Sequence, residues 1–295
     1  MFQDGRGVGQ PTVGVRSSRT EPPLSPEELR ALESAVTDVG GVLRNPDGTE
    51  DFDGTDDFDE TGRSDGTDGF DSVGHFDATD EADGRINGLD LVVAIGDEAL
   101  SASVSSGSEV PILPVSVDHA IEQVTRSNLA PGLEAVLAGD GVVRRHPVLT
   151  ARIGDEQPRR GLFDVTLTAA EPAHISEYAV TSRSERIARF RADGVVVATP
   201  IGTRGYAGSV SAPELSPAIN ALAVSPIAPF VMHANHWVLP DDDLSVSVER
   251  DEVPISVSVD GRDFTTIGTE LPVTIGVEAS VPTVSVAATQ DDEGS

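Results

Sequence analysis

The chain has 295 residues, among them 20 arginines, no lysine and 50 aspartates and glutamates, and its formal net charge is −30 at pH 7. Such a charge repels nucleic acid and anionic membrane surfaces, which excludes both as partners. The chain contains no cysteine, which excludes disulfides, thiolate metal ligands and thiol catalysis. It has neither an apolar run of about 18 residues nor an apolar signal core at its start, so we expect a cytoplasmic protein.

The acidic composition indicates a halophilic protein. Repulsion among so many carboxylates would destabilise the compact state at low salt. Molar salt shortens the screening length to about 3 Å and leaves the carboxylates as a hydrated surface. An ordinary acidic protein with an acidic tail, here residues 290–295, is the alternative.

The first part of the chain alternates predicted strands and helices. Residues 11–15 read as a strand, and a helix is expected from Ser25 to residue 39, because Ser25 can cap it, Pro26 suits its first turn and acidic residues follow. The further elements expected here are a strand at 90–95, a helix from residue 99, a strand at 110–115 and a helix at 130–137. This alternation is typical of an α/β layer.

An acidic, repetitive segment interrupts this alternation. Residues 47–83 hold fifteen acidic residues against one basic residue, Arg63, and phenylalanines recur at spacings that are multiples of six. The apolar content is too low to offset the entropy of ordering the segment, which predicts a disordered insert over 46–84. Calcium binding by its Asp-Gly-Thr-Asp groups is the alternative, although their spacing does not match an EF-hand loop.

Beyond His146 the pattern becomes mostly β. The expected strands are 148–153, 161–168, 175–182, 186–191, 194–199, 244–249, 255–259, 271–277 and 283–287, several of them with period-two alternation. The predicted fold class is therefore an α/β N-terminal layer plus a mostly β C-terminal domain. We expect domains at 1–118 and 119–289, followed by the acidic tail.

The stretch DGVVVATPIGTRGYAGSV, residues 193–210, is an apolar strand that stops at Thr199-Pro200 and enters a loop of small residues. It resembles the NAD kinase family, in which a strand runs into a Thr-Pro-Thr-Gly-Ser-Thr-Ala-Tyr loop. Further segments are similar to the family in order and spacing. Residues 91–97 resemble a strand that ends in Gly-Gly-Asp-Gly-Thr, and residues 161–165 fall where the family has an Asn-acid pair. Residues 223–230 and 237–240 resemble a Pro-rich turn and its return strand, and residues 258–262 resemble an Asp-Gly hairpin. The resemblance covers residues 91–287, and the chain is identified as a divergent, haloarchaeal-type member.

The resemblance implies the two-domain NAD kinase fold and an enzyme of NADP biosynthesis. The family transfers a phosphoryl group from ATP, with Mg²⁺, to the 2′-hydroxyl of the NAD ribose. It also implies a homo-oligomer assembled through the β domain. A nucleotide is thus the expected small-molecule partner.

The resemblance also assigns candidate site residues. Asp97, after Gly96, matches the family's carboxylate and would orient or deprotonate the acceptor hydroxyl; capping the following helix is its alternative role. The nucleotide-binding candidates are Gly96, Asp164, Thr199, Gly202, Thr203 and Tyr206, of which Asp164 matches the acidic member of the pair and Tyr206 the loop tyrosine. A purely structural tight turn is the alternative for the loop. No metal site is expected in the protein itself, because the His233 and His236 pair lacks a third ligand.

Several positions depart from the family pattern. Phe163 replaces the amide-bearing Asn, and Arg204 and Gly205 stand where the family has Thr and Ala. Arg204 either binds an anion or has no binding role in a loop that is purely structural.

The departures are largest where phosphate would bind. Ile95, Glu98 and Ala99 differ from the Gly-Gly-Asp-Gly-Thr motif, and Glu98 adds bulk and negative charge. The next Gly-rich stretch of the family is Ser-Val-Asp-His-Ala here, at 116–120. Two hypotheses follow: an active NAD kinase that uses Asp97, or a nucleotide-binding or regulatory homologue whose phosphoryl transfer is weakened or lost. The altered phosphate loops favour the second.

Overall fold

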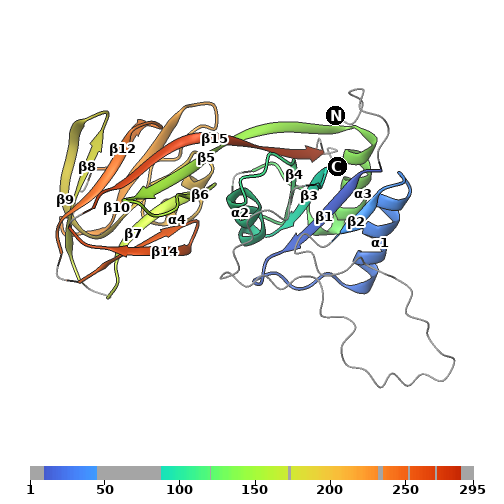
Figure 1. The fold of residues 1–295 in the computed structure, drawn as a ribbon, viewed down its shortest axis with the longest axis horizontal. Coiled ribbons are helices and arrows are strands. Elements are labelled where there is room, and N and C mark those ends of the chain that lie inside the picture. Colours follow the sequence, from blue (N-terminus) through green and yellow to red (C-terminus); the bar gives the residue numbers. More distant parts are fainter. Residues whose placement is uncertain are drawn as a thin grey trace, which may run out of the picture. The chain divides into compact units, whose positions relative to one another are not determined.

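The computed structural model describes residues 10–44, 88–119, 121–171, 174–231, 235–251, 253–269 and 271–286. The expected insert at 46–84, the tail at 290–295 and His233 lie outside these residues. The described chain forms two compact units (Figure 1): unit 1 falls within Met1–Val117, Glu122–Arg145 and Pro282–Ser295, and unit 2 within Asp118–Ile121 and His146–Val281. None of the helices in these ranges has the length and apolar character that a membrane crossing requires.

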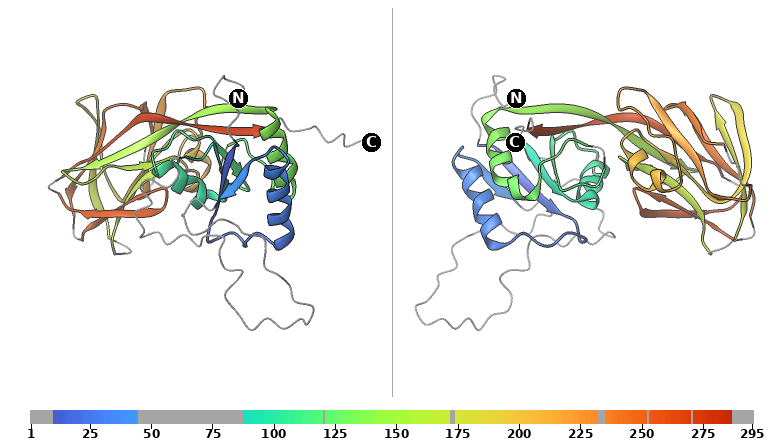
Figure 2. Two further views of the ribbon diagram at one scale, coloured as in Figure 1. Left: turned by 45° about the vertical axis from the view of Figure 1, so that its right-hand side comes forward. Right: turned by 180° about the vertical axis from the view of Figure 1, so that it is seen from behind.

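Unit 1 is a parallel sheet covered by helices. Its strands lie in the order β2 (Val42–Arg44), β1 (Thr12–Ser17), β3 (Leu91–Ile95), β4 (Ile112–Val115) and the end of β15 (Val273–Val286). Helices α1 (Pro26–Thr37) and α3 (Leu129–Ala138) pack together on one face, and α2 (Asp97–Ser105) covers the other (Figure 2). All five residues of β3 are buried as a result, which confirms the predicted α/β layer.

The start of α1 confirms the capping signal of the sequence. The Ser25 hydroxyl accepts from the Glu28 N–H at 3.2 Å, and Glu28 Oε2 accepts from the Ser25 N–H at 2.7 Å. Arg126, from the segment before α3, donates to Glu28 Oε1 at 2.8 Å. This hydrogen bond is the main cause that lowers the pKa of Glu28 to about 2. The same carboxylate therefore caps α1 and ties it to the α3 segment.

Unit 2 is built from antiparallel strands. The main path of the sheet follows the order β14 (Arg262–Ile267), β13 (Ile255–Val259), β7 (Asp164–Ala169), β9 (Glu185–Ala198), β8 (Ser176–Ser182), β12 (Leu244–Arg250) and β15. Two strands extend it beside β9: β10 (Ala221–Pro229) pairs with β9, and β11 (Trp237–Pro240) pairs with β10. Strand β5 (Gly141–Ile153) pairs with β15 and with β6 (Arg159–Gly161). This confirms the mostly β C-terminal part. Strands β5 and β15 have residues in both units.

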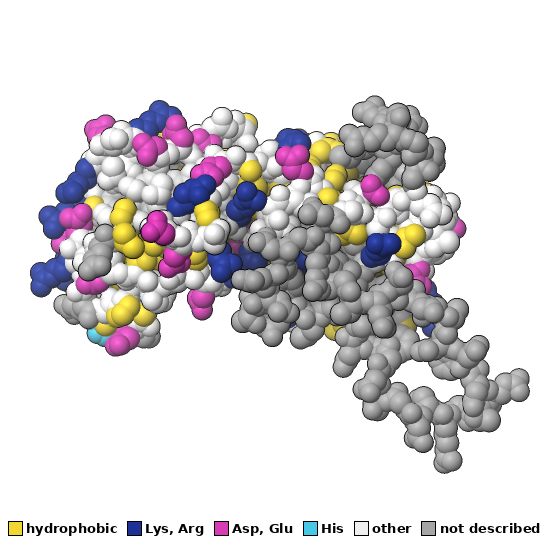
Figure 3. All heavy atoms as spheres, viewed as in Figure 1, with side chains coloured by type: hydrophobic (Ala, Val, Ile, Leu, Met, Phe, Trp, Pro, Cys, Tyr) yellow, Lys and Arg dark blue, Asp and Glu magenta, His cyan; other side chains and the backbone are white. Residues whose placement is uncertain are grey.

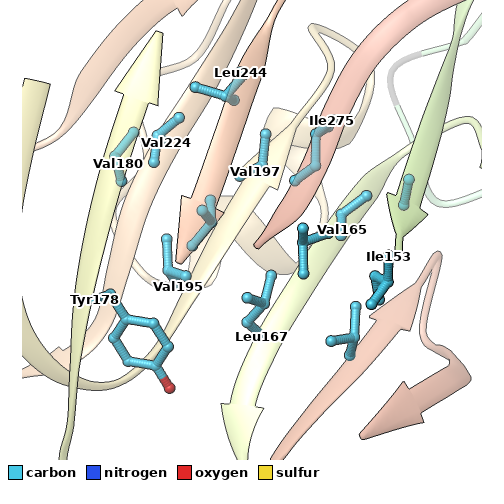
Figure 4. Packing of buried hydrophobic residues seen from close by; sticks show 14 of the residues in the cluster. Ile153, Val165, Leu167, Tyr178, Val180, Val195, Val197, Val224, Leu244 and Ile275 are labelled. Atoms are coloured by element: carbon cyan, nitrogen blue, oxygen red, sulfur yellow. The ribbon is translucent and has the colours of Figure 1, made fainter. Parts of the chain in front are cut away.

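Strand β9 organises the core of unit 2. Its second half pairs with β7 on one side and β10 on the other, whereas its first half pairs with β8. Val195 and Val197 from β9 pack with Val165 and Leu167 from β7 and with residues of several other strands, all of them buried (Figure 4).

Some strand predictions were wrong. The sequence predicted separate strands at 186–191 and 194–199, but β9 is continuous. In the same way β15 joins the predicted strands at 271–277 and 283–287. The predicted strand at 161–168 is instead split into β6 and β7. The Pro-rich segment at 223–230 lies in strand β10 rather than a turn, because neighbouring strands bind its remaining amides.

Charged side chains on the described surface occur in mixed pairs. Figure 3 shows arginines beside aspartates and glutamates. Examples are Arg183 with Asp242 at 2.8 Å and Arg189 with Glu177 at 3.0 Å. Exposed pairs of this kind contribute about 0–1 kcal/mol each, so unit 2 is held together by its core rather than by them.

Gly194 allows the backbones of β9 and β7 to approach each other closely. A Cβ at this position would lie 2.4 Å from the Leu167 carbonyl oxygen and 2.8 Å from Thr168 Cγ2. We therefore expect Gly194→Ala to reduce the free energy of unfolding by about 1–3 kcal/mol through overpacking. Chemical denaturation in molar KCl measures this. Gly268→Ala is the matched control, since the nearest atom to its added Cβ would be 3.5 Å away; equal effects of the two variants would contradict the explanation.

Candidate functional site

Asp260 holds the chain bend between β6 and β7. Asp260 and Gly261 form the tip of the β13–β14 hairpin with φ values of 50° and 71°, which is the geometry of a two-residue Asp-Gly turn. The Asp260 carboxylate accepts three backbone N–H groups, from Leu162 at 2.8 Å, Phe163 at 2.7 Å and Asp164 at 3.1 Å. The sequence indicated the hairpin, but it gave no sign of this role for Asp260.

The loop after β9 is fastened to the same bend. The buried Thr199 hydroxyl donates to the Leu162 carbonyl at 2.7 Å and accepts from the Gly202 N–H at 3.2 Å. The Thr199 N–H donates to the Phe163 carbonyl at 2.9 Å. A Cβ on Gly202 would lie 2.0 Å from that carbonyl oxygen, so only glycine fits there.

The side chains of Thr203 and Arg204 in this loop also form hydrogen bonds within unit 2. The Thr203 hydroxyl donates to the Pro200 carbonyl at 2.7 Å and accepts from the Leu215 N–H at 3.3 Å, in a side chain that is 2% exposed. Arg204 extends to the surface, where its Nε donates to Glu214 at 2.6 Å. The loop therefore accommodates Arg204 by pairing it with an acid, while Thr199 and Thr203 maintain the shape of the loop.

Asp164 and Tyr206 form the polar part of the site. Asp164, the first residue of β7, is 6% exposed, and its Oδ1 accepts from the Thr166 hydroxyl at 3.2 Å. Burial and then the charge of Asp260 raise the pKa of Asp164 to about 6, against the opposing effects of Thr166 and of His119. Tyr206 is 46% exposed. Its pKa is raised by partial burial and by the charge of Asp164, so the two side chains interact electrostatically.

Three departures from the family pattern meet in a single contact. The rings of His119 and Phe163 are stacked, with centroids 3.6 Å apart and planes 10° from parallel. A Cβ on Gly205 would lie 2.3 Å from His119 Nε2, so Gly205 leaves room for the imidazole. The sequence presented these three residues as separate changes, because they lie far apart along the chain.

Gly96, Asp97 and Glu98 form a second group of candidates, at the end of β3 in unit 1. Gly96 has φ 82°, and a Cβ there would lie 2.8 Å from Glu21 Cγ. It is also the N-cap of α2, which begins at Asp97 and not at residue 99 as predicted. The alternative role of Asp97 as the helix cap is therefore wrong.

Glu98 is bound by the loop that follows β1. Its Oε2 accepts from the Ser18 hydroxyl and from the Arg19 N–H, each at 3.1 Å. The structure thus collects Asp164, Thr199, Gly202, Thr203 and Tyr206 in unit 2 and leaves Gly96 and Asp97 in unit 1.

The raised pKa of Asp164 predicts a pH-dependent stability. Between the ordinary value of 3.8 and about 6, the folded chain binds this proton more tightly than the unfolded chain does, so stability falls as the pH rises through this window. The destabilisation is absent below pH 4 and complete above pH 6. We expect Asp164→Asn to remove it, which would favour the variant by about 2–3 kcal/mol more at pH 7 than at pH 4.

Denaturation curves of both proteins at the two pH values measure this difference. Asp155→Asn, at an exposed position, is the control. Parallel pH profiles for the wild type and Asp164→Asn would show that the prediction is wrong.

Comparisons with known proteins agree with this architecture. The family model described as ATP-NAD kinase C-terminal domain matches residues 162–287. The NAD kinase of Heliobacterium modesticaldum is 29% identical over 192 residues, which cover 62% of this chain and 68% of that protein. The NAD kinase of Syntrophotalea carbinolica is 30% identical over 192 residues, covering 61% of this chain and 67% of that one.

Two solved structures share the fold. A yeast NADH kinase complexed with NADH superposes with a TM-score of 0.69 at 16% identity, covering 94% of this chain and 84% of that one. An NAD kinase from Archaeoglobus fulgidus in complex with ATP gives a TM-score of 0.66 at 17% identity, covering 94% and 93%. At these identities the likeness concerns the fold alone, whereas the sequence relatives establish descent. The chain therefore belongs to the NAD kinase family.

Proposed function

We propose that this chain is an NAD kinase homologue that binds an adenine nucleotide and whose phosphoryl transfer to NAD is weakened or lost. The observation that supports this best is the position of the Glu98 carboxylate on the Ser18 hydroxyl and the Arg19 N–H. Hydroxyl and backbone N–H donors just beyond the carboxyl end of a parallel strand are the groups that bind phosphate in α/β folds. Here the chain's own carboxylate occupies these donors.

Glu98 therefore opposes a polyphosphate in two ways. An incoming phosphate must displace Glu98 to reach the two donors, and it then faces the displaced negative charge. Ala99, which stands where the family has Thr, is 2% exposed and supplies no hydroxyl. Both effects weaken the binding of a triphosphate more than the binding of a nucleoside.

The polar groups of unit 2 support nucleotide binding. Asp164 has a largely buried carboxylate at the start of a strand, and Tyr206 has a partly exposed ring that is close enough for this charge to raise its pKa. A nucleoside can donate N–H or O–H groups to the first and stack on the second. NAD and ATP are the proposed ligands, since the related solved proteins are complexes with NADH and ATP. We further propose a cytoplasmic homo-oligomer adapted to molar salt.

The alternative is an active NAD kinase. It is favoured by the presence of Asp97 as the first residue of α2, directly after Gly96 with its positive φ. Asp97 would accept the proton of the ribose hydroxyl or orient it. Mg²⁺, when bound with ATP, would neutralise phosphate charge and be held mainly by the phosphates, with a carboxylate such as that of Asp97 as a protein ligand.

A direct assay distinguishes the two functions. We expect the purified chain in molar KCl, supplied with NAD, Mg²⁺ and either ATP or polyphosphate, to form NADP at a rate at least about 10²-fold below a typical kcat of about 10 s⁻¹. Enzymatic cycling of NADP measures the product. Turnover at the typical rate that is abolished by Asp97→Asn would establish the active alternative instead.

The role of Glu98 can be tested in the chain itself. We expect Glu98→Gly together with Ala99→Thr to tighten ATP binding by about tenfold, equivalent to about 1.4 kcal/mol, because Ser18 and Arg19 become available and a hydroxyl is added. Calorimetric titration with ATP in molar KCl measures this. Ala99→Thr alone is the control for the hydroxyl. An unchanged affinity in the double variant would locate the obstacle elsewhere, for instance at Asp118.

A further inference from the structure

We infer that Arg126 is a positioning residue for the donors of unit 1: it holds the segment between β1 and α1 in the conformation that presents the Ser18 hydroxyl and the Arg19 N–H to an oxyanion. The inference rests on the proposed function, in which the Glu98 carboxylate occupies these donors and a phosphate group of a ligand competes for them. All residues concerned belong to unit 1.

The segment begins at a place in the sheet where ligands are commonly bound. Strand β1 pairs with β2 on one side and with β3 on the other, and α1 and α2, the helices that follow β1 and β3, cover opposite faces (Figure 2). In open parallel sheets the crevice beyond the carboxyl ends of two such strands is the usual ligand site. The Ser18 N–H donates to the Ile95 carbonyl at 2.8 Å, which fixes the start of the segment beside the end of β3.

Arg126 binds the middle of the segment with all three nitrogens of its guanidinium group. Its Nη1 donates to the Pro22 carbonyl at 2.6 Å, its Nη2 to the Pro23 carbonyl at 2.7 Å, and its Nε to Glu28 Oε1 at 2.8 Å. Two successive prolines have no N–H with which to hold the backbone in place. The planar guanidinium fixes its donors relative to one another, so it sets the direction of both carbonyls and ties them to the start of α1.

A single turn carries this constraint back to the donors. The Glu21 N–H donates to the Ser18 carbonyl at 3.3 Å, and the hydroxyls of Ser18 and Thr20 lie 2.7 Å apart. The turn is thus held at Ser18 by β3 and, immediately after Glu21, by Arg126. Because the Arg19 N–H lies inside this turn, its direction depends on both attachments.

Arg126 also compensates negative charge next to the donors. Its Nη1 lies 4.0 Å from Glu21 Oε2. The Glu21 Cγ and the Ser18 Cβ lie 2.8 Å and 2.9 Å from the position that a Cβ of Gly96 would take, so both side chains border the same glycine. Loss of Arg126 would remove the compensation of Glu21 beside Ser18, and the carboxylate would then oppose an anion there.

Hydrogen exchange of the Arg19 amide, followed by NMR in molar KCl, tests the positioning role. We expect Arg126→Ala to accelerate this exchange by about tenfold or more, as Glu98→Ala does by removing the acceptor, because the N–H no longer points at the carboxylate. Ser25→Ala is the matched control: it removes the capping hydroxyl of α1 but leaves the bonds from Arg126 to the prolines. It should keep the exchange within about twofold of the wild type, and an equal acceleration in this control would overturn the inference.

Arg126→Lys separates geometry from charge. The lysine ammonium has a single donor atom and cannot span two carbonyls and a carboxylate as the guanidinium does, so we expect the Arg19 amide to exchange nearly as fast as in Arg126→Ala. Wild-type protection of this amide in Arg126→Lys would contradict the inference, since it would show that a positive charge suffices. Thermal unfolding of each variant verifies that it is folded.

Binding of ATP provides a second readout. In the background of Glu98→Gly with Ala99→Thr the donors are open, and we expect the addition of Arg126→Ala to weaken ATP binding by about tenfold in calorimetric titrations. Arg152→Ala is the control, because Arg152 pairs with Glu278 in unit 2, and it should not change the affinity. Equal ATP affinities with and without Arg126 would show that the inference is wrong.

The outcomes separate this inference from the proposed function. If the background of Glu98→Gly with Ala99→Thr binds ATP no better than the wild type, the proposed role of Glu98 fails, and the Arg19 amide of the wild type still decides whether Arg126 positions the donors. If that background binds ATP more tightly, but the Arg19 amide exchanges equally in the wild type and in folded Arg126→Ala, the inference alone is overturned.

Discussion

The carboxylate of Asp260 is the constraint on which the unit 2 site depends. It accepts three consecutive backbone N–H groups, and hydrogen bonds to a charged group contribute about 1.5–3 kcal/mol each. The bend then fixes the Phe163 carbonyl that receives Thr199 and leaves no space for a side chain at Gly202. After burial, the same negative charge is the second cause that raises the pKa of Asp164 to about 6. Asp260 therefore determines both the shape of the site and its charge.

The family fold is retained, while two groups of side chains have changed in different ways. In unit 1 the change at Glu98 is internally satisfied, since the carboxylate has found a hydroxyl and an amide as partners. In unit 2 the replacement of an amide by Phe163 is accompanied by the arrival of His119 on its ring. The first change adds a carboxylate that the chain itself binds, and the second places a stacked pair of rings where the family pattern has an amide.

Much of the fold could be predicted because its signals are local. Ser25, Pro26 and Glu28 specify the start of α1 within four residues, and the apolar run of β3 shows that both faces are covered. The prediction divided β9 before Gly194, whereas Gly194 lies inside the strand, where β7 approaches it closely. The start of α2 was misplaced since Gly96 caps it without a side chain.

The site was harder to predict, because its contacts connect distant parts of the chain. Asp260 lies about a hundred residues beyond the amides that it binds, and no local pattern links them. Tyr206 and Asp164 could be chosen from the loop and strand motifs, but the buried positions of Thr199 and Thr203 depend on how the loop folds against the bend.

The fit of His119 against Gly205 makes these two positions interdependent. A methyl group at 205 would lie 2.3 Å from His119 Nε2, so the imidazole keeps its place on Phe163 only while residue 205 has no side chain. The effect of a substitution at either position therefore depends on which residue occupies the other.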